Sequence, residues 1–361
     1  MIDPPFRAEH VGSLLRPAVL LDGRRQFARG EIDKTALTAA EDRAIEDAVA
    51  LQERVGLRLA TDGEFRRQSY HSYFYSQLGA VSFEAPDGAA GARGAQPVAT
   101  IKSRLTLKGP IHGADFAFLK ARTHALPKIT IPGPCALHFR GGDAAITAHA
   151  YRDTDQFWED IVAAFRSELG SLAAAGCRYV QIDETAFAKF ADPEVQAMLI
   201  ARGDKPGALI DKYIDVTNRV IAGFPMRIGM HLCRGNRGGQ WHAEGSYDPV
   251  AEKLFNALDI DFFFLEYDSP RAGDFSPLRF VPKDKTIVLG LVSTKTNTLE
   301  DRTALKRRIG DAAHFVDLDR LAVSPQCGFA SVDTGNPLSA EMQEAKLRLV
   351  VDLARDTWGT A

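Results

Sequence analysis

Four side chains in the C-terminal half of the sequence carry atoms that bind soft metal ions. His231 and Cys233 stand two residues apart in HLC, Glu266 directly follows the apolar run FFFL, and Cys327 lies in SPQCGF. In an extended segment residues i and i+2 share a face, so both side chains of HLC can reach one ion. With Glu266 and Cys327 they offer one nitrogen, one carboxylate oxygen and two sulfurs, a set that suits four-coordinate zinc. The sequence therefore predicts a zinc site made of these four residues.

Each of these residues also has a purely structural interpretation. A cysteine at the end of a strand is usually a small buried apolar residue. A carboxylate such as Glu266, at the end of so apolar a run, needs a partner because an unpaired buried charge is costly. Zinc would supply that partner. Cys135 has no ligand-type neighbour and Cys177 lies at the start of a predicted strand, so both are interpreted as structural.

The predicted ligand set indicates thiol chemistry. A four-ligand zinc site is normally structural. Glu266, however, is a hard ligand on a soft ion, and a substrate thiol could displace it. Zinc-bound thiols lose their proton, which provides a thiolate nucleophile for alkyl transfer near neutral pH.

The elements that must position these residues alternate between short apolar runs and amphipathic stretches. The runs predict eight strands, at residues 8–11, 57–61, 128–131, 178–182, 226–230, 262–265, 286–292 and 321–323. Apolar residues at three- and four-residue steps predict helices at residues 34–55, 155–175, 208–222, 249–258, 298–312 and 339–357. Alternating strands and helices favour a parallel sheet, and eight such units favour an α/β fold with a single (β/α)8 TIM barrel as one domain, residues 1–361. An open doubly wound sheet is the alternative, because a sequence cannot show closure.

In a barrel the carboxyl ends of all strands share one rim, where barrel enzymes keep their active sites. The polar residues that follow the predicted strands include Ser13, Glu64, Asp183, His231, Cys233, Glu266, Lys295 and Cys327. Residues 68–110 interrupt the alternation after the second strand. They contain an aromatic segment, a Gly/Ala-rich stretch and a period-two run at residues 100–107. We expect an insertion built of a loop and a β-hairpin arm, either covering the barrel mouth or decorating the surface.

Composition excludes several classes of protein. The net charge is −3, from 44 basic and 47 acidic side chains in 361 residues, so nucleic acid and anionic membrane are poor partners. The sequence shows neither a signal peptide pattern nor an apolar run long enough to span a membrane. Four cysteines are too few for a disulfide scaffold, which predicts a cytoplasmic protein with reduced thiols. A homo-oligomer is left open.

Six motifs, each at the end of a predicted strand, carry a family resemblance. They are HVGSLLRP (10–17), TDGEFRR (61–67), QIDETAF (181–187), HLCRGN (231–236), FLEYDSP (264–270) and SPQCGF (324–329). Together they resemble the cobalamin-independent methionine synthase family, specifically its C-terminal catalytic barrel and short single-barrel relatives. The resemblance implies zinc as the cofactor, His231, Cys233, Glu266 and Cys327 as its ligands, and methyl transfer to homocysteine, giving methionine.

The resemblance also implies that Ser13, Glu64 and Asp183 hold the amino-acid part of homocysteine. Two carboxylates could bind its ammonium group, and Ser13 with nearby backbone amides could hold its carboxylate. Alternatively, Glu64 pairs with Arg66 or Arg67, and Asp183 is a carboxylate at a helix start.

The sequence departs from the family in regions that concern the methyl donor. The second, N-terminal barrel of the full-length synthases is absent. A histidine expected after the seventh strand is missing from GLVSTKTNTLED, where Lys295 is nearest, so Lys295 and Asp183 are the candidates for catalysis. His138 and Phe139 replace an aromatic segment that packs on the pterin. The donor is therefore expected to be a methyltetrahydrofolate-type compound, a methylated corrinoid or another small methyl carrier.

Other functions stay open at this stage. A related zinc enzyme could alkylate another thiol, for example by opening an epoxide, and Arg234, Asn236 and Arg237 could then bind an anionic acceptor. The same three residues could equally cap a helix or pair on the surface. A metal-free decarboxylase of related fold, like the uroporphyrinogen decarboxylases, would need no thiolates. In a non-catalytic protein, zinc would only stabilise the rim of the barrel.

Overall fold

A parallel sheet of six strands occupies the middle of the molecule. The computed structural model describes residues 4–79, 81–84, 98–147 and 150–361. Within the sheet the strands follow the order β10-β9-β8-β7-β6-β5, and every neighbouring pair is parallel. The strands are β1 Leu59–Ala60, β2 Val81–Glu84, β3 Val98–Ile101, β4 Leu126–Pro127, β5 Ile129–Pro132, β6 Tyr179–Glu184, β7 Arg227–Leu232, β8 Phe262–Glu266, β9 Thr286–Val292 and β10 Leu321–Pro325.

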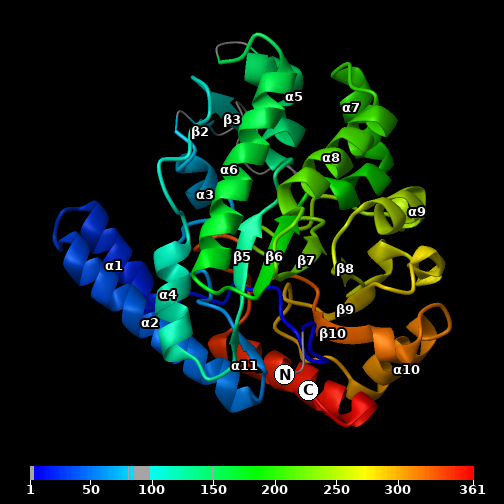
Figure 1. The fold of residues 1–361 in the computed structure, drawn as a ribbon. Coiled ribbons are helices and arrows are strands. Elements are labelled where there is room, and N and C mark those ends of the chain that lie inside the picture. The colour runs from blue at the N-terminus through cyan, green and yellow to red at the C-terminus, as the bar shows by residue number, and fades with distance from the viewer. Residues whose placement is uncertain (1–3, 80, 85–97, 148–149) are drawn as a thin grey trace.

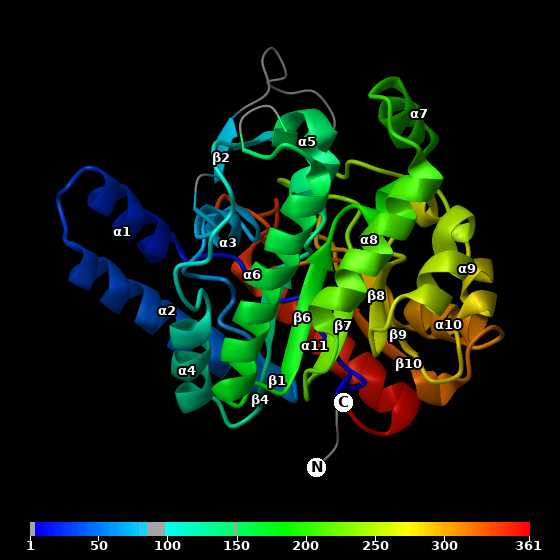
Figure 2. The ribbon, with the colours of Figure 1, turned by 45° about the horizontal axis from the view of Figure 1, so that its top comes forward.

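Helices lie around the outside of this sheet, as Figures 1 and 2 show. Because parallel neighbours need a crossover connection, each sheet strand is followed by helical segments that return the chain to the next strand. The α-helices are α1 Ala18–Ala28, α2 Lys34–Val55, α3 Ser72–Ser76, α4 Gly113–Arg122, α5 Ala136–Thr147, α6 Thr154–Ala174, α7 Pro193–Ala201, α8 Pro206–Ile221, α9 Asp248–Ala257, α10 Arg302–Ala312 and α11 Ala340–Trp358. Short 3₁₀ helices are η1 Phe187–Ala191, η2 Pro270–Ala272, η3 Ser276–Phe280 and η4 Leu318–Arg320.

The sheet strands are buried along almost their whole length, which is why they consist mainly of apolar residues. All five residues of β8 are buried, and so are all six of β6. A parallel strand with both faces covered has no solvent-facing side to carry alternating polar residues. The acidic residues in these strands lie at the carboxyl ends, where β6 ends in Asp183 and Glu184 and β8 ends in Glu266.

Backbone pairing continues beyond both edges of the six-stranded sheet. Next to β10, Ala8 forms a parallel bridge with Val323. On the other side, β4 precedes β5 in the chain, separated from it by Lys128, and pairs in parallel with β1. The segment after Ala8 returns to the turn that follows β1, because the Leu14 amide donates to the Gly63 carbonyl at 3.1 Å.

The predicted strands and helices are largely confirmed. Seven of the eight predicted strands fall on strands of the structure, and the first, residues 8–11, is reduced to the bridge at Ala8. The six predicted helices are present, but the fifth begins at Arg302 instead of residue 298. Asp301 caps that helix by accepting a hydrogen bond from the Ala304 amide at 2.7 Å, and this fixes its start.

The predicted hairpin in residues 68–110 is present as the antiparallel pair of β2 and β3, with Val81 opposite Ile101. The predicted Gly/Ala-rich stretch lies within residues 85–97, outside the described residues. The prediction that the period-two run extends as a strand to residue 107 is wrong. β2 starts at Val81, so no partner strand remains beyond Ile101, and the Leu105 amide instead donates to the Tyr151 hydroxyl at 2.7 Å.

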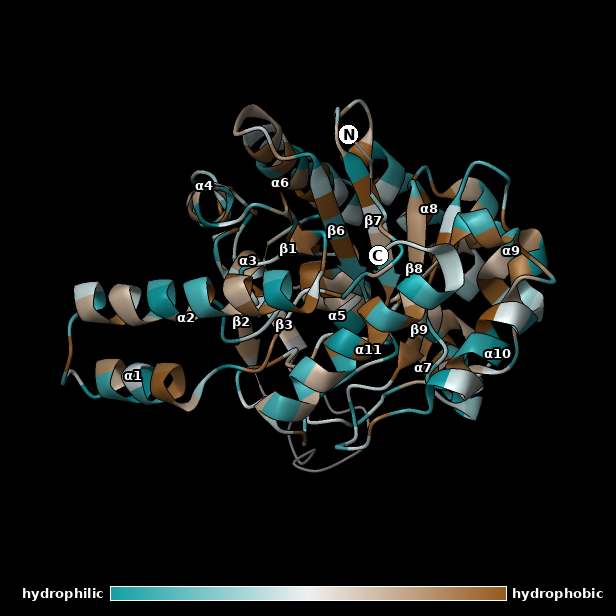
Figure 3. Cartoon of the chain, turned by 90° about the horizontal axis from the view of Figure 1, so that it is seen from below, coloured by the Kyte–Doolittle hydropathy of each residue, from teal (hydrophilic) through white to brown (hydrophobic). Residues whose placement is uncertain are grey.

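Helices α1 and α2 form an arm on one side of the molecule. Figure 3 shows them side by side, projecting beyond the other helices. Asp33 caps α2 by accepting from the Ala36 amide. Among the described residues, no helix combines the length and the apolar composition needed to cross a bilayer.

Candidate functional site

Four side chains with metal-binding atoms meet at the carboxyl ends of three strands. His231 lies in β7, Cys233 directly follows β7, Glu266 ends β8, and Cys327 lies two residues beyond β10. One potential ligand atom from each residue lies within 4.8 Å of those of the other three. All four residues are buried. The structure thus brings together the four residues that the sequence nominated as metal ligands.

The geometry of this cluster fits zinc. The Cys233 and Cys327 sulfurs are 3.9 Å apart, and a tetrahedral ion with Zn–S bonds of about 2.3 Å would set them about 3.8 Å apart. His231 Nε2 lies 3.9 Å from Glu266 Oε1. Neither ring nitrogen of the buried His231 has a hydrogen bond of ordinary geometry within the described chain. A buried imidazole without a partner is costly, and a bound ion would satisfy it.

The two cysteines of the cluster differ in pKa. Hydrogen bonding with Cys233, together with the positive potential of His231, lowers the pKa of Cys327 well below that of an ordinary thiol. The hydrogen bond with Cys327 and burial raise the pKa of Cys233 well above it. Metal ligands of this type bind as thiolates, so without an ion the cluster favours the coordinating form at Cys327 alone.

Glu266 is held on both oxygens. Oε1 accepts a hydrogen bond from the Arg234 amide at 2.8 Å, and Oε2 accepts one from Arg271 Nη2 at 2.8 Å. Lys295 Nζ lies 3.7 Å from Oε2. Asp268 in turn contacts Arg271 at 2.7 Å and Lys295 at 3.5 Å. Burial opposes ionisation of Glu266, but Lys295 and Arg271 outweigh it and lower the pKa of Glu266 to about 2.

These contacts place Lys295 behind the cluster. Its ammonium nitrogen faces the outer oxygen of Glu266. In the described part of the chain, Lys295 lines neither the small inner cavity nor the larger outer cavity that open at the cluster. Arg271 was missed by the sequence reasoning. It lies in SPRAG, beyond the strand end, and nothing in its spacing distinguishes it from a surface arginine.

A small inner cavity connects the cluster to the residues expected to hold an amino acid. Its walls include Ser13, Glu64 and Asp183 together with His231, Cys233 and Cys327. The chain approaches itself closely here, since a side chain at Gly328 would place its Cβ 1.9 Å from the Ser13 hydroxyl oxygen. Position 328 therefore requires glycine if Ser13 is to face the cavity.

Glu64 has one carboxylate oxygen engaged and the other free of protein partners. Oε1 accepts from the Thr130 hydroxyl at 2.8 Å, and Oε2 is buried without a hydrogen bond in the described chain. Arg67 Nη1 is 3.9 Å from Oε1 and donates instead to the Thr130 carbonyl at 2.9 Å. Arg66 pairs with Asp42 and with Asp115. The alternative pairing with Arg67 is therefore present as a long, buried ion pair, which leaves Oε2 of Glu64 without a partner in the described chain.

Asp183 lies inside β6, so the alternative of a helix-start carboxylate is wrong. Its Oδ1 accepts from Gln181 Nε2 at 2.7 Å. Burial, reinforced by the charge of Glu64, raises the pKa of Asp183 to about 7. Asp183 next to the free Oε2 of Glu64 forms a site that an ammonium group would stabilise.

The backbone at Glu64 is strained. Its φ is +61°, and it is the one non-glycine residue with positive φ in the described part of the chain. Such a conformation costs on the order of 1–3 kcal/mol and persists where the surroundings hold it. The turn after β1 therefore directs this carboxylate into the cavity at an energetic cost.

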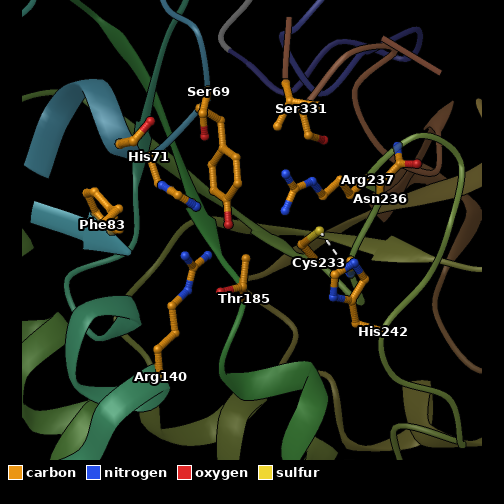
Figure 4. A pocket seen from close by; sticks show the side chains of 14 residues that line it. Ser69, His71, Phe83, Arg140, Thr185, Cys233, Asn236, Arg237, His242 and Ser331 are labelled. Carbon is orange, nitrogen blue, oxygen red and sulfur yellow. Dashed lines mark hydrogen bonds between the residues drawn. The ribbon is translucent and has the colours of Figure 1, made fainter. Parts of the chain in front are cut away.

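An outer cavity of about 180 Å³ opens from the same cluster (Figure 4). Tyr70, Cys233 and Ser331 line both cavities, so the two meet at the cluster. Figure 4 shows His71, Arg140 and Arg237 pointing toward one space. Tyr70 and His71 come from the start of the insertion and Arg140 from α5. Sequence reasoning noted Arg237 but missed Arg140, which follows no strand end.

Of the other residues singled out in the sequence, Asn236 lines the outer cavity and the rest lie away from both cavities. Arg234 is buried over the Tyr247 ring at 4.1 Å. His138 bonds to the Tyr213 hydroxyl at 2.7 Å, and Phe139 packs on Phe190. The remaining two cysteines are buried outside the cluster, with Sγ atoms near the carbonyls of Tyr213 for Cys135 and Tyr179 for Cys177.

Comparison with known sequences gives one family and several relatives. The family model described as "Cobalamin-independent synthase, Catalytic domain" matches residues 8–356. The uncharacterized protein YxjH of Bacillus subtilis is 41% identical over 361 residues, covering 98% of this chain and 95% of that protein. The methionine synthase of Pyrococcus furiosus is 24% identical over 324 residues, covering 90% of this chain and 86% of that protein.

Solved structures give the same fold. A protein of Listeria monocytogenes, provisionally assigned as a vitamin-B12 independent methionine synthase, superposes with a TM-score of 0.76 at 35% identity, covering 99% of this chain and 100% of that one. A B12-independent methionine synthase of Shewanella sp. W3-18-1, in complex with selenomethionine, gives a TM-score of 0.75 at 21% identity, with 98% of both chains covered. At that identity the second likeness shows the fold alone.

Proposed function

This chain belongs to the cobalamin-independent methionine synthase family, represented by its catalytic domain, and from that membership we propose that it transfers a methyl group to homocysteine, giving methionine. One observation carries the proposal. Three residues of the metal-binding cluster, His231, Cys233 and Cys327, line the inner cavity together with Ser13, Glu64 and Asp183. An amino acid held by the second set would direct its thiol toward the first.

We propose zinc as the ion held by the four clustered residues. When bound, zinc lowers the proton affinity of a thiol at the cluster, so that a thiolate exists near neutral pH. The unpartnered nitrogens of His231 and the sulfur spacing support this choice. The thiolate sulfur then forms a bond to the methyl carbon, and the bond between that carbon and the donor breaks, with its electron pair leaving on the donor.

The other residues position the substrate and the ligands. Glu64 and Asp183 bind the ammonium group, and Ser13 binds the carboxylate of homocysteine. Arg271 and Lys295 hold the outer oxygen of Glu266 and compensate its charge. This position supports a positioning role for Lys295, while the role of an acid that assists the leaving group stays a prediction.

We further propose that the strands close into a (β/α)8 barrel in one domain, residues 1–361. The bridge from Ala8 to Val323, the pairing of β1 with β4, and the bond from Leu14 to Gly63 support closure. In a barrel these contacts are the joints that link the N-terminal segment and β1 to the six-stranded sheet.

Cobalt substitution tests the proposed function directly. Protein loaded with Co²⁺ should show a stronger cobalt–sulfur absorption when homocysteine is added, and a smaller response to thiols that lack the ammonium group. Glu64→Gln should weaken the homocysteine response by about tenfold, the equivalent of one charge-assisted hydrogen bond. A cluster that binds no metal, or metal that responds to no thiol, would overturn the proposal and favour a metal-free decarboxylase or a purely structural ion.

A further inference from the structure

The guanidinium of Arg16 contacts three of the backbone segments that carry the lining of the inner cavity. Its Nη2 donates to the Glu64 carbonyl at 2.9 Å and to the Arg67 carbonyl at 3.2 Å, both in the turn after β1. Its Nη1 donates to the Ala330 carbonyl in the loop after β10 and, at 3.4 Å, to the Leu14 carbonyl in its own segment. One side chain therefore connects segments that are far apart in the sequence.

Arg16 is buried although it carries a charge. It is 6% exposed and, in the described part of the chain, donates hydrogen bonds to main-chain carbonyls and to no carboxylate. Burial lowers the pKa of Arg16 to about 10, although the charge of Glu64 opposes this, so the guanidinium is charged at neutral pH. A buried cation is costly unless its hydrogen bonds compensate, so packing alone does not explain an arginine here. Its bonds instead indicate a role in fixing the backbone.

The Ala330 peptide links Arg16 to Ser13. Its carbonyl accepts a hydrogen bond from Arg16, and its amide donates to the Ser13 hydroxyl oxygen at 3.4 Å. The neighbouring Phe329 amide donates to the Ser13 carbonyl at 2.9 Å. Because the hydroxyl oxygen accepts from the backbone, the hydroxyl hydrogen points elsewhere and can be donated to a carboxylate in the cavity.

The contact with the Glu64 carbonyl supports the strained turn. The Glu64 amide donates to Asp62 Oδ1 at 2.9 Å, and its carbonyl accepts from Arg16, so the backbone of Glu64 is held on both sides. A non-glycine residue with a φ of +61° keeps that conformation only where its surroundings hold it. Arg16 therefore helps to keep the Glu64 carboxylate directed into the cavity.

We propose that Arg16 is the positioning residue of the amino-acid site. It holds the Glu64 carboxylate, which binds the ammonium group, and the Ser13 hydroxyl, which binds the carboxylate, at the separation that one amino acid spans. This inference rests on the proposed function, because it assigns both groups to one homocysteine molecule. Only the fork of a guanidinium reaches both segments, since the ammonium group of a lysine is a single point.

Two thiols that differ in their polar groups test this role in protein loaded with Co²⁺. Homocysteine carries the ammonium and carboxylate groups, and mercaptoethanol carries neither. Arg16→Gln should weaken the cobalt–sulfur response to homocysteine by about tenfold, which corresponds to one hydrogen bond to a charged group. The response to mercaptoethanol should not change, because the cluster itself is intact. Arg16→Lys should give an intermediate loss.

Arg24→Gln is the matched control. Arg24 also donates to carbonyls of the turn after β1, those of Phe65 and Arg67, but within the described chain it contacts neither Glu64 nor Ala330. Its substitution should leave the preference for homocysteine at the wild-type value. Equal losses for the two thiols in Arg16→Gln would make Arg16 a purely structural residue and overturn the proposal. An unchanged preference for homocysteine would also overturn it.

A double variant tests whether Arg16 acts through Glu64. If the two residues acted independently, combining Arg16→Gln with Glu64→Gln would multiply their losses to about hundredfold. We expect a clearly smaller loss of homocysteine affinity, because a turn that no longer holds its carboxylate has less to lose. A full hundredfold loss would contradict the assigned role.

A stability measurement separates this proposal from the proposed function. Glu64→Gly should unfold at a higher urea concentration than Glu64→Ala, since glycine adopts a positive φ without strain. This difference should disappear in an Arg16→Gln background and persist in an Arg24→Gln background. Arg16→Lys replaces Arg16→Gln in both measurements if the glutamine variant does not fold.

A difference that persists without Arg16 would overturn the proposal, even if wild-type protein responds to homocysteine. If the difference disappears but the wild type responds to no thiol, Arg16 stands as the residue that positions the turn. In that case only the proposed transfer to homocysteine is overturned.

Discussion

Glu266 differs from the other three clustered side chains in how it is held. Its outer oxygen contacts Arg271 at 2.8 Å and Lys295 at 3.7 Å, and both cations also contact Asp268. A carboxylate held this way keeps its orientation whether or not its inner oxygen binds an ion. Partners of this kind typically set metal affinity by 10–100-fold.

Replacing Arg271 by methionine should therefore lower zinc affinity by about 10–100-fold, because Glu266 loses the hydrogen bond that orients it. Competition with a chromogenic chelator measures the affinity, and the cobalt spectrum reports the ligand geometry. Arg279→Met serves as the control, since this arginine lies nearby on η3 and contacts Asp248 instead. Equal zinc affinity in the two variants would show that the contact between Arg271 and Glu266 has no influence on metal binding.

The Cys327→Ala substitution should lower the metal affinity by more than a factor of about 100. Removing a metal ligand weakens binding more than removing a residue that only hydrogen-bonds to a ligand. Metal content after dialysis against a weak chelator measures this. Cys177→Ala removes a buried cysteine outside the cluster and should keep the full metal content. Stoichiometric zinc in the Cys327 variant would place the ion elsewhere.

Glu184 gives a stability prediction that depends on pH. Burial raises the pKa of Glu184 to about 7, and its Oε2 has no hydrogen-bond partner within the described chain. Between pH 4.5 and 7 the unfolded chain releases this proton before the folded one does, so stability falls as pH rises through that window. Glu184→Gln stays neutral and should be more stable than wild type by roughly 2–3 kcal/mol at pH 8, with little difference at pH 4.5.

Urea denaturation at several pH values tests this, with Glu194→Gln as the control at an exposed glutamate. Comparing each variant with wild type at the same pH removes the contribution of other titrating groups, including Asp183. A difference that does not change between pH 4.5 and 8 would show that Glu184 is ionised in the folded protein.

Some of these residues could be predicted from the sequence, and the reason is chemical. Soft-metal ligands are rare residue types, and their positions at the ends of predicted strands indicate that they share one location. Arg271 and Arg140 could not be found this way. Arginines are frequent, and what distinguishes these two is only their contact with residues far away in the chain.

At the scale of elements, the turn after β1 combines function with backbone strain. Glu64 has φ +61°, which glycine adopts without cost and other residues do not. Glu64→Gly should therefore be more stable than Glu64→Ala by about 1 kcal/mol, although glycine is usually the less stabilising residue. Thermal or urea unfolding of the two variants measures the difference.

The same pair of substitutions at Arg66 provides the control, because its φ is not positive. There alanine should be the more stable residue. Both Glu64 variants should still lose homocysteine affinity, which separates the strain from the charge. If Glu64→Ala were the more stable of the first pair, the strained conformation would not exist in solution.

Two of the helices that the sequence analysis missed, α5 and α7, each have a physical reason. Helix α7 has the apolar stretch AMLIA, whose residues follow one another without a helical period, and several of them are exposed. Helix α5 is interrupted at Gly142, whose φ is +62°, so its sequence does not show a continuous helical pattern. Strand ends also shifted by one or two residues, since pairing with a neighbour decides where a strand stops.

At the scale of the whole molecule, a buried ion pair joins the N-terminal segment to the sheet. Glu9 and Lys128 are both fully buried and 3.3 Å apart, and Lys128 also lies over the rings of Tyr179 and Phe264. Breaking such a pair leaves an uncompensated buried charge. Glu9→Gln should therefore destabilise the protein by about 3 kcal/mol.

Adding Lys128→Met to that variant should recover part of the loss, because neither charge then remains. A double-mutant cycle in urea measures the coupling. If the two substitutions change the free energy of unfolding additively, residue 9 is not packed against residue 128. The proposed barrel closure would then lose the support of this ion pair.

Closure of the barrel could not be predicted, because each contact that supports it connects segments far apart in sequence. These contacts are made by backbone atoms, which every residue type carries. The bridge from Ala8 to Val323 is one such contact. The family and the α/β class with a parallel sheet were accessible from motifs and alternation, and the matched family model and a solved structure support them. The cytoplasmic location and the oligomeric state stay predictions.

The order of the metal-binding residues along the chain has a consequence for synthesis. They run from His231 to Cys327 in a chain of 361 residues, and the last of them follows β10. Until Cys327 has been synthesised, the nascent chain therefore has an incomplete set of these residues. If the cluster holds the proposed ion, all four residues can bind it only after β10 and Cys327 have been synthesised, before the last helix, α11. Chains that end before Cys327 would lack one ligand and should bind the ion weakly.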